Sequence, residues 1–190
     1  MHLGIDYGAK LAGTTVICYE KDKQLELVQS EKKQDADQFI LNHLAVLQPK
    51  SVFIDAPLSL PLAYFGKGDN YFFRVCDREL QAMSPMFLGG LTARAIRLIN
   101  AEETTNISFK ETYPAQIVRH YLTTIKGYKK QKTYIAPFCD FLSTQLPLTL
   151  ACTPQNWHQI DALLAWWAGW RYQQGAVKTY GEEIEGFIYI

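Results

Sequence analysis

The sequence predicts an α/β fold built on a mixed sheet, with three antiparallel strands followed by parallel strands and with helices on its flanks. Two observations carry this prediction. Three alternating, β-branched runs follow one another at the start of the chain, with only short turns between them. After a helical stretch comes a short and almost wholly apolar run, which is typical of a parallel strand that is covered on both faces.

The first half of the chain predicts a meander, a helix and a central strand. The three strands of the meander are expected at about residues 2–7, 12–19 and 24–30. Asp35 and Asp37 precede apolar residues at helical spacing, and Pro49 marks the end of this helix. Because a helix connects the meander to the run 51–55, that strand should lie parallel to the first one and near the centre of the sheet.

The middle of the chain predicts a loop, several helices and one further strand. Residues 57–70 contain prolines, glycines and aromatic side chains, and should form an ordered loop or lid beside the end of the central strand. A short strand is expected in "SFKETYP". The helices are expected at about 71–83, 89–103, 115–124 and between Pro137 and Pro147.

The last part of the chain predicts one long helix and a closing strand. Thr153 should cap the helix, with Pro154 in its first turn and Gly175 at its end. Small residues along this helix would permit a close approach to the sheet. The final "EGFIYI" is expected to close the sheet as an edge strand.

The composition limits which class of protein this chain can be. With 190 residues and 48% hydrophobic content, one compact domain over residues 1–190 is expected. No apolar run approaches the ~20 residues that span a bilayer, and the N-terminus has no basic region before an apolar block, so we expect a cytoplasmic protein without a membrane segment. The four dispersed cysteines favour reduced thiols over a zinc or disulfide framework. Because 19 basic and 19 acidic side chains cancel, any polyanionic partner must be held locally.

Three aspartates stand where a catalytic site is commonly built. Asp6 ends the first strand in a glycine-flanked turn, and Asp55 ends the central strand. Asp161 follows His158 by three residues on the long helix, so the two share one helix face. Carboxylates are the hard oxygen ligands that Mg²⁺ or Mn²⁺ prefers, and a pair of such ions can drive phosphodiester hydrolysis. His158 could orient an attacking water, ligate a cation or assist the leaving group. The strand-end acids are also explained as turn formers, and His158 as a solvated or capping residue.

Other residues are candidates on weaker patterns. Glu111 ends the "SFKE" strand, where it could serve as a fourth metal ligand or as a structural hydrogen-bond partner. The candidate substrate-binding residues are Arg74, Arg78, Arg94, Lys129 and Lys130. The arginines could grip a phosphate, but pairing with neighbouring acids or packing along the core edge explains them as well. The lysines lie beside tyrosines in "KGYKKQK", which suits contacts with a nucleic-acid backbone, although a solvated loop is the simpler explanation.

Several motifs resemble a known family. "GIDYGAKLAGTTV", "VFIDAPLSLP", "RVCDREL", "LTARAIRL", "ETYPAQ" and "DALLAWWAGW" are similar to the successive signatures of a predicted nuclease family, number 429 among the domains of unknown function, and together span nearly the whole chain. "HQIDALLAWWA" also resembles the last helix of Holliday-junction resolvases, in which an H-x-x-D pair approaches the metals. The resemblance implies a ribonuclease H-like fold and a nuclease activity that is itself mostly a prediction for the family.

We therefore expect a nuclease that uses Mg²⁺ or Mn²⁺, holds the ions with Asp6, Asp55 and Asp161, and binds DNA or RNA. Two other classes stay open. A relative that keeps the fold could act as a binding or scaffold protein. The first motif also resembles the phosphate-binding hairpin of sugar kinases and related ATPases, but those proteins need two such domains and no second D-x-G hairpin is present. The sequence leaves open the choice of DNA or RNA, the mode of cutting and the oligomeric state.

Overall fold

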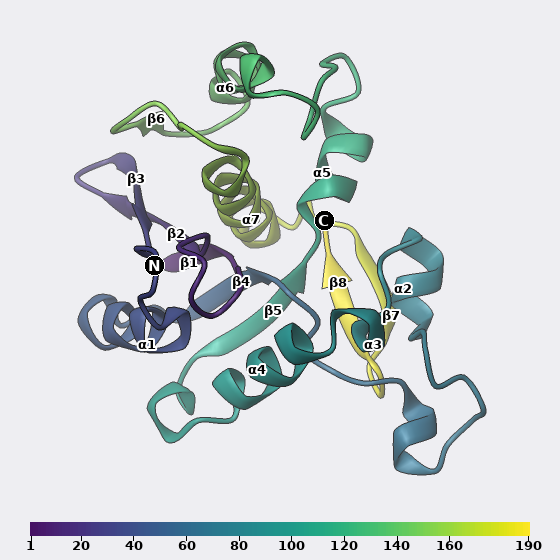
Figure 1. Ribbon diagram of the computed structural model, residues 1–190. Helices are drawn as coiled ribbons and strands as arrows, with labels where there is room; N and C mark the ends of the chain where they lie inside the picture. The colour runs from purple at the N-terminus through teal and green to yellow at the C-terminus, as the bar shows by residue number, and fades with distance from the viewer.

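The computed structural model describes residues 1–190 and contains one eight-stranded sheet (Figure 1). The strands are β1 (His2–Asp6), β2 (Val16–Lys21), β3 (Gln24–Gln29), β4 (Ser51–Asp55), β5 (Ser108–Thr112), β6 (Thr149–Leu150), β7 (Thr179–Glu182) and β8 (Gly186–Tyr189). Their order across the sheet is β6-β3-β2-β1-β4-β5-β8-β7. Strands β1 to β3 are antiparallel, whereas β4 is parallel to β1 and β5 to β4. This arrangement confirms the expected ribonuclease H-like fold, with β4 in the middle of the sheet.

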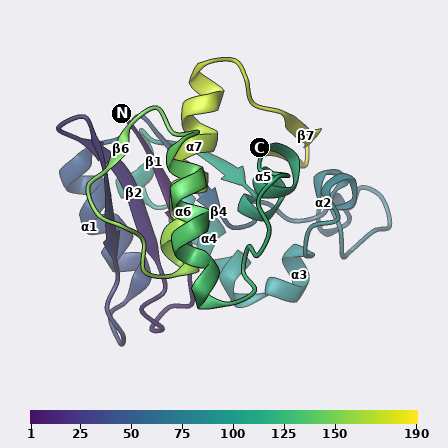
Figure 2. The same cartoon turned by 90° about the horizontal axis from the view of Figure 1, so that it is seen from above.

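Helices cover both faces of this sheet. They are α1 (Ala36–Leu47), α2 (Val75–Leu80), α3 (Pro85–Leu88), α4 (Gly90–Ile99), α5 (Pro114–Tyr121), α6 (Ile135–Ser143) and α7 (Trp157–Gln173), with short 3₁₀ turns η1 (Leu62–Phe65), η2 (Glu102–Thr104) and η3 (Lys132–Tyr134). Figures 1 and 2 show α7, α5 and α6 on one face, and α1 and α4 on the other. Two separate hydrophobic clusters fill these two interfaces. None of the helices is long and apolar enough to cross a membrane.

The alternation of side chains along β1 and β4 separates the two clusters. Leu3 and Ile5 of β1 pack with α1 and α4, together with Val52 and Ile54 of β4. Phe53 instead belongs to the cluster that contains α7. Because successive strand residues point to opposite faces, the last residue of each strand points to the α7 side.

The long last helix begins later than expected. Thr153 does not cap it, and Pro154 lies before its first turn. The cap is Asn156, whose side chain accepts a hydrogen bond from the backbone N–H of Gln159 at 3.0 Å. The Asn156 amide also donates to the Gln29 side chain at 3.0 Å, so the capping residue is held against β3 as well.

The C-terminal strand was expected at the edge of the sheet, and this expectation was wrong. β8 pairs in parallel with β5 and antiparallel with β7, so β7 forms the edge. The middle helices are also shorter than predicted. Gln81 has a left-handed backbone that ends α2, and the Ser84 side chain caps α3, so the stretch 71–83 does not form one continuous helix.

Candidate active site

Two acids of the site come from neighbouring parallel strands. β1 and β4 pair in register, with Asp6 opposite Asp55 at their carboxyl ends. Both side chains point to the face that α7 covers, since they lie an even number of residues from Gly4 and Phe53 on that face. The period of the strands and the parallel register therefore bring these two carboxylates together without any contribution from a loop.

Helix α7 supplies the third acid because it lies unusually close to β1. A Cβ atom at Gly4 would stand 2.1 Å from the backbone nitrogen of Trp166 and 2.4 Å from the carbonyl oxygen of Ala162. Only glycine at this point of β1 allows the two backbones to approach so closely. The same stretch of α7 carries Asp161, whose side chain is fully buried against the sheet.

The three carboxylates form one cluster. Oxygens of Asp6, Asp55 and Asp161 all lie within 4.8 Å of one another, as the strand-end and helix positions predict. At this distance two ionised carboxylates repel by about 3.5 kcal/mol at an effective dielectric of about 20. Burial, together with the charges of Asp6 and Asp161, raises the pKa of Asp55 well above its ordinary value. Burial also raises the pKa of Asp161 to about 6, although Lys129 opposes this effect.

The donor set of this cluster fits a divalent cation. Carboxylate oxygens are the hard ligands that Mg²⁺ and Mn²⁺ take. In addition, the Oδ2 atom of Asp161 is buried and already holds a positive group, the ammonium of Lys129, at 2.6 Å. A divalent cation would meet the same need for positive charge at this oxygen.

His158 reaches the cluster from the first turn of α7. Its Nδ1 donates a hydrogen bond to Oδ2 of Asp6 at 2.8 Å, and this bond raises the pKa of His158. The imidazole side chain is 44% exposed, so the residue stays open to solvent. With Nδ1 held by Asp6, the other ring nitrogen is the one left to hold a proton or a water molecule.

The lysine-rich loop contributes two neighbouring residues to Asp161. The Tyr128 hydroxyl donates to Oδ1 of Asp161 at 2.5 Å, and Nζ of Lys129 lies 2.6 Å from Oδ2. Burial works against the charged form of Lys129, but the carboxylate of Asp161 outweighs burial and raises the pKa of the lysine. No periodicity in this loop signals either contact with Asp161.

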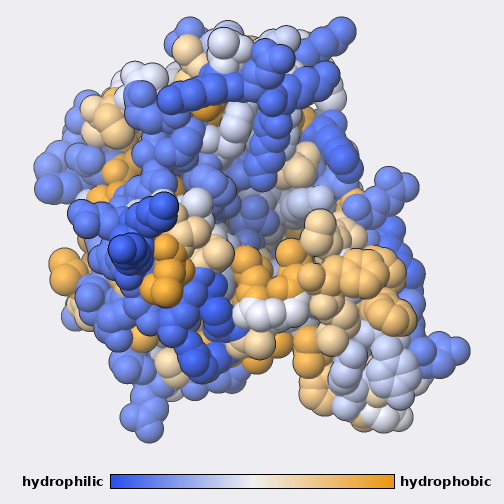
Figure 3. Space-filling view, in the orientation of Figure 1, coloured by the Kyte–Doolittle hydropathy of each residue, from blue (hydrophilic) through white to orange (hydrophobic).

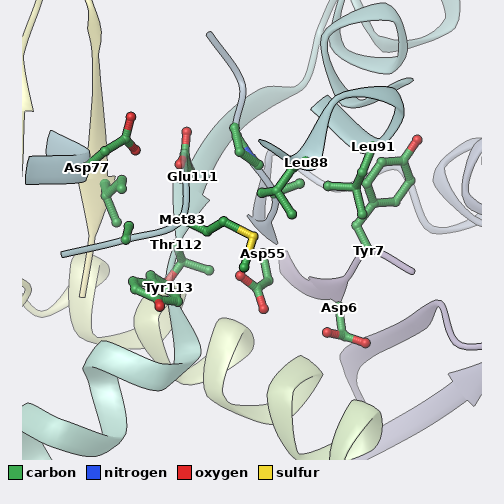
Figure 4. A pocket seen from close by; sticks show the side chains of 14 residues that line it. Asp6, Tyr7, Asp55, Asp77, Met83, Leu88, Leu91, Glu111, Thr112 and Tyr113 are labelled. Carbon is green, nitrogen blue, oxygen red and sulfur yellow. The ribbon is translucent and has the colours of Figure 1, made fainter. Parts of the chain in front are cut away.

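Glu111 does not join the three aspartates. It pairs in register with Ile54 on β4, so its side chain points to the opposite face from Asp55. There it receives two hydrogen bonds of 2.7 Å from Arg74, which also pairs with Asp77 at 2.7 Å. Figure 4 shows Glu111 and Asp77 on the other side of the pocket from Asp6.

The candidate substrate-binding residues lie in different environments, and most of them do not contact the three aspartates. Arg74 is fully buried in its ion pairs and presents no surface to a substrate. Arg94 binds Asp37 at 2.6 Å and the carbonyl oxygen of Gly8 at 3.1 Å. Lys130 and Arg78 are exposed and form no ion pair. Only Lys129 touches the acidic cluster.

A cleft of about 260 Å³ opens beside the two strand ends. Asp6 and Asp55 line it together with apolar side chains, among them Met83, Leu88 and Leu91 (Figure 4). Figure 3 shows hydrophobic side chains gathered below the centre of this face, where α3 lies, and mainly hydrophilic ones above it. A bound molecule would thus meet charge at one end of the cleft and apolar surface along its wall.

No family model matches the chain, and no curated protein matches it. Among solved structures, the chain is similar to "T. thermophilus RuvC in complex with Holliday junction substrate", with 13% identity over 95% of this chain and 97% of that chain and a TM-score of 0.46. It is also similar to "Thermus thermophilus RuvC structure", with 14% identity over 95% and 98% of the two chains and a TM-score of 0.43. The fold assignment rests on the strand order and directions described above.

Proposed function

We propose that the chain is a single ribonuclease H-like domain that hydrolyses phosphodiester bonds of DNA or RNA with the help of Mg²⁺ or Mn²⁺. The observation that carries this proposal is the convergence of Asp6, Asp55 and Asp161, whose carboxylate oxygens lie within 4.8 Å of one another. The resemblance of several sequence motifs to the predicted nuclease family numbered 429 implies the same activity, although no family model matches the chain. We also propose that the protein works in the cytoplasm.

The residues divide the chemistry between them. The three aspartates would hold one or two divalent cations, which when bound stabilise charge on a phosphate and lower the pKa of a water molecule. His158, fixed by Asp6, holds the attacking water and takes up its proton. The water oxygen forms a bond to phosphorus while the P–O bond to the ester oxygen breaks, and the leaving alkoxide takes a proton from solvent to become an alcohol. Lys129 and Lys130, which lie together beside the cluster, would contact the substrate backbone.

An assay with matched acid substitutions tests this function. The parent, Asp6→Asn and Asp140→Asn proteins are incubated with panels of DNA and RNA, with Mn²⁺ or with a chelator. Asp140 is an exposed acid on α6 outside the cluster, so its variant controls for the loss of a negative charge. We expect Mn²⁺-dependent cleavage by the parent and by Asp140→Asn, and none by Asp6→Asn.

His158→Ala gives a graded result in the same assay. It removes a group that holds water but leaves the three carboxylates in place, so its loss of rate should be smaller than that of Asp6→Asn. If neither polymer is cut, or if Asp6→Asn cuts as well as the parent, the nuclease proposal fails. The fold would then serve as a binding or scaffold protein.

A further inference from the structure

We propose that Lys129 is an internal counter-ion of the acidic cluster, which a divalent cation must displace from Asp161 in order to bind. The inference rests on the metal site of the proposed function and concerns a residue outside the three ligands. In the metal-free protein the ammonium group of Lys129 would occupy the position beside Asp161 for which the incoming cation competes.

The contact itself is the first support. Nζ of Lys129 lies 2.6 Å from Oδ2 of Asp161. The ammonium group thus occupies, by charge, the oxygen that a cation at the cluster would also bind. Asp161 is buried, whereas the Lys129 side chain is 48% exposed, so the lysine can leave without disturbing the core.

The charge around the cluster is the second support. Three carboxylates converge, and the basic groups within contact of them are Lys129 and His158. The guanidinium groups of Arg74 and Arg94 are engaged elsewhere, Arg74 with Glu111 and Asp77 and Arg94 with Asp37. Lys129 is therefore the one permanently charged side chain that offsets the repulsion among the aspartates in the absence of a metal.

The loop that carries Lys129 is the third support. It lies between α5 and η3, outside any helix or strand, and Lys129 has a left-handed backbone with φ of 56°. That conformation is unfavourable for a residue with a side chain, by about 1 kcal/mol. The Tyr128 and Lys129 contacts with Asp161 offset this cost. Once a cation takes the carboxylate, the loop loses part of what holds it in place.

The displaced lysine would remain beside the site. Lys129, Lys130 and Lys132 line one surface depression together with Trp157. An ammonium released from Asp161 would thus join two other lysines next to the cations. Metal binding would convert Lys129 from a partner of the protein's own carboxylate into a partner for a substrate phosphate.

Calorimetric titration with Mn²⁺ alone tests the competition. The proteins compared are the parent, Lys129→Ala, Lys129→Arg and Lys130→Ala, with Asp161→Asn as the variant that lacks the ligand. We expect Lys129→Ala to bind Mn²⁺ about tenfold more tightly, which corresponds to about 1.4 kcal/mol. Lys129→Arg keeps the charge and should stay close to the parent. Lys130→Ala removes a neighbouring charge that does not touch Asp161, and should also leave the affinity unchanged.

A second measurement uses the unmutated protein. Acetylation of individual lysines by acetic anhydride is followed by mass spectrometry with and without saturating Mn²⁺. Lys129 should be protected in the metal-free protein and become more reactive when Mn²⁺ binds, because its ammonium leaves the ion pair. Lys130 in the same loop serves as the internal control, and its reactivity should not change.

The outcomes separate this inference from the nuclease proposal. The inference is overturned, even if nucleic acid is cleaved, when parent and Lys129→Ala bind Mn²⁺ equally well. It is also overturned when the acetylation of Lys129 does not change as Mn²⁺ binds. Absence of Mn²⁺ binding in both proteins would overturn it as well. If Lys129 is displaced but no polymer is cut, the inference stands and the nuclease proposal fails.

Discussion

Acidification should stabilise the metal-free protein over a defined pH window because Asp161 ionises only at a cost. Burial raises the pKa of this carboxyl from its ordinary value of 3.8 to about 6 in the folded protein. Between these two values the folded state keeps a proton that the unfolded chain has released. Stability must therefore fall as the pH rises through this window, and must be recovered when the pH is lowered again.

The size of the effect follows from the two pKa values. The difference between 3.8 and about 6 corresponds to about 3 kcal/mol in total. About 1 kcal/mol of this should appear between about pH 7 and about pH 5. With a urea m-value of about 2.5 kcal/mol/M, the unfolding midpoint would move up by ~0.4 M. The raised pKa of Asp55 acts in the same direction.

Urea unfolding in the presence of a chelator measures this effect. The parent is compared with Asp161→Asn at both pH values, because the asparagine cannot titrate and removes the Asp161 contribution. Saturating Mn²⁺ should also flatten the pH dependence of the parent, since bound cations keep the carboxylates ionised. An equal change in stability of parent and variant between the two pH values would show that Asp161 does not carry the raised pKa.

Three other predictions follow from the packing and the charges. Gly4→Ala should lower the free energy of unfolding in urea by about 3 kcal/mol or more, since a Cβ would overlap the α7 backbone. Gly90→Ala places its Cβ in open space and should not lower it. Equal effects of the two substitutions would argue against the close approach of α7 to β1. Arg74→Met should cost about 3–5 kcal/mol because it leaves buried acids without their cation, and a variant as stable as the parent would contradict the buried ion pairs. Mn²⁺ should raise the melting temperature of the parent but much less that of Asp55→Asn, and equal shifts in a thermal scan would remove Asp55 from the metal site.

The convergence of the aspartates was predictable because it depends on regular structure. The period of two along a strand and the three-residue spacing of His158 and Asp161 on a helix are written locally in the sequence. The helix that connects the meander to "SVFID" predicts that this strand lies parallel to "GID". Small residues on both elements then allow the helix to approach the sheet.

Other parts of the site depend on contacts between distant residues and could not be predicted. Glu111 looks like a fourth strand-end acid, but the register between β4 and β5 places its side chain on the other face, and sequence alone does not fix that register. Likewise, Tyr128 and Lys129 lie in an irregular loop, and their contact with Asp161 spans more than thirty residues. The start of α7 at Asn156 depends on Gln29 in β3.

The protein neutralises its buried acids in two ways, and only one of them is compatible with the proposed metal site. Glu111 is paired with Arg74, a fully buried guanidinium that cannot lose its proton and has no route to solvent, so this ion pair is permanent. Asp161 is paired with Lys129, whose flexible side chain is half exposed and leads into an irregular loop. Only the second pair can be opened at a modest cost. Reactive chemistry is therefore to be sought at Asp6, Asp55 and Asp161, and the Arg74 network is best understood as the support that holds the neighbouring strand ends in place.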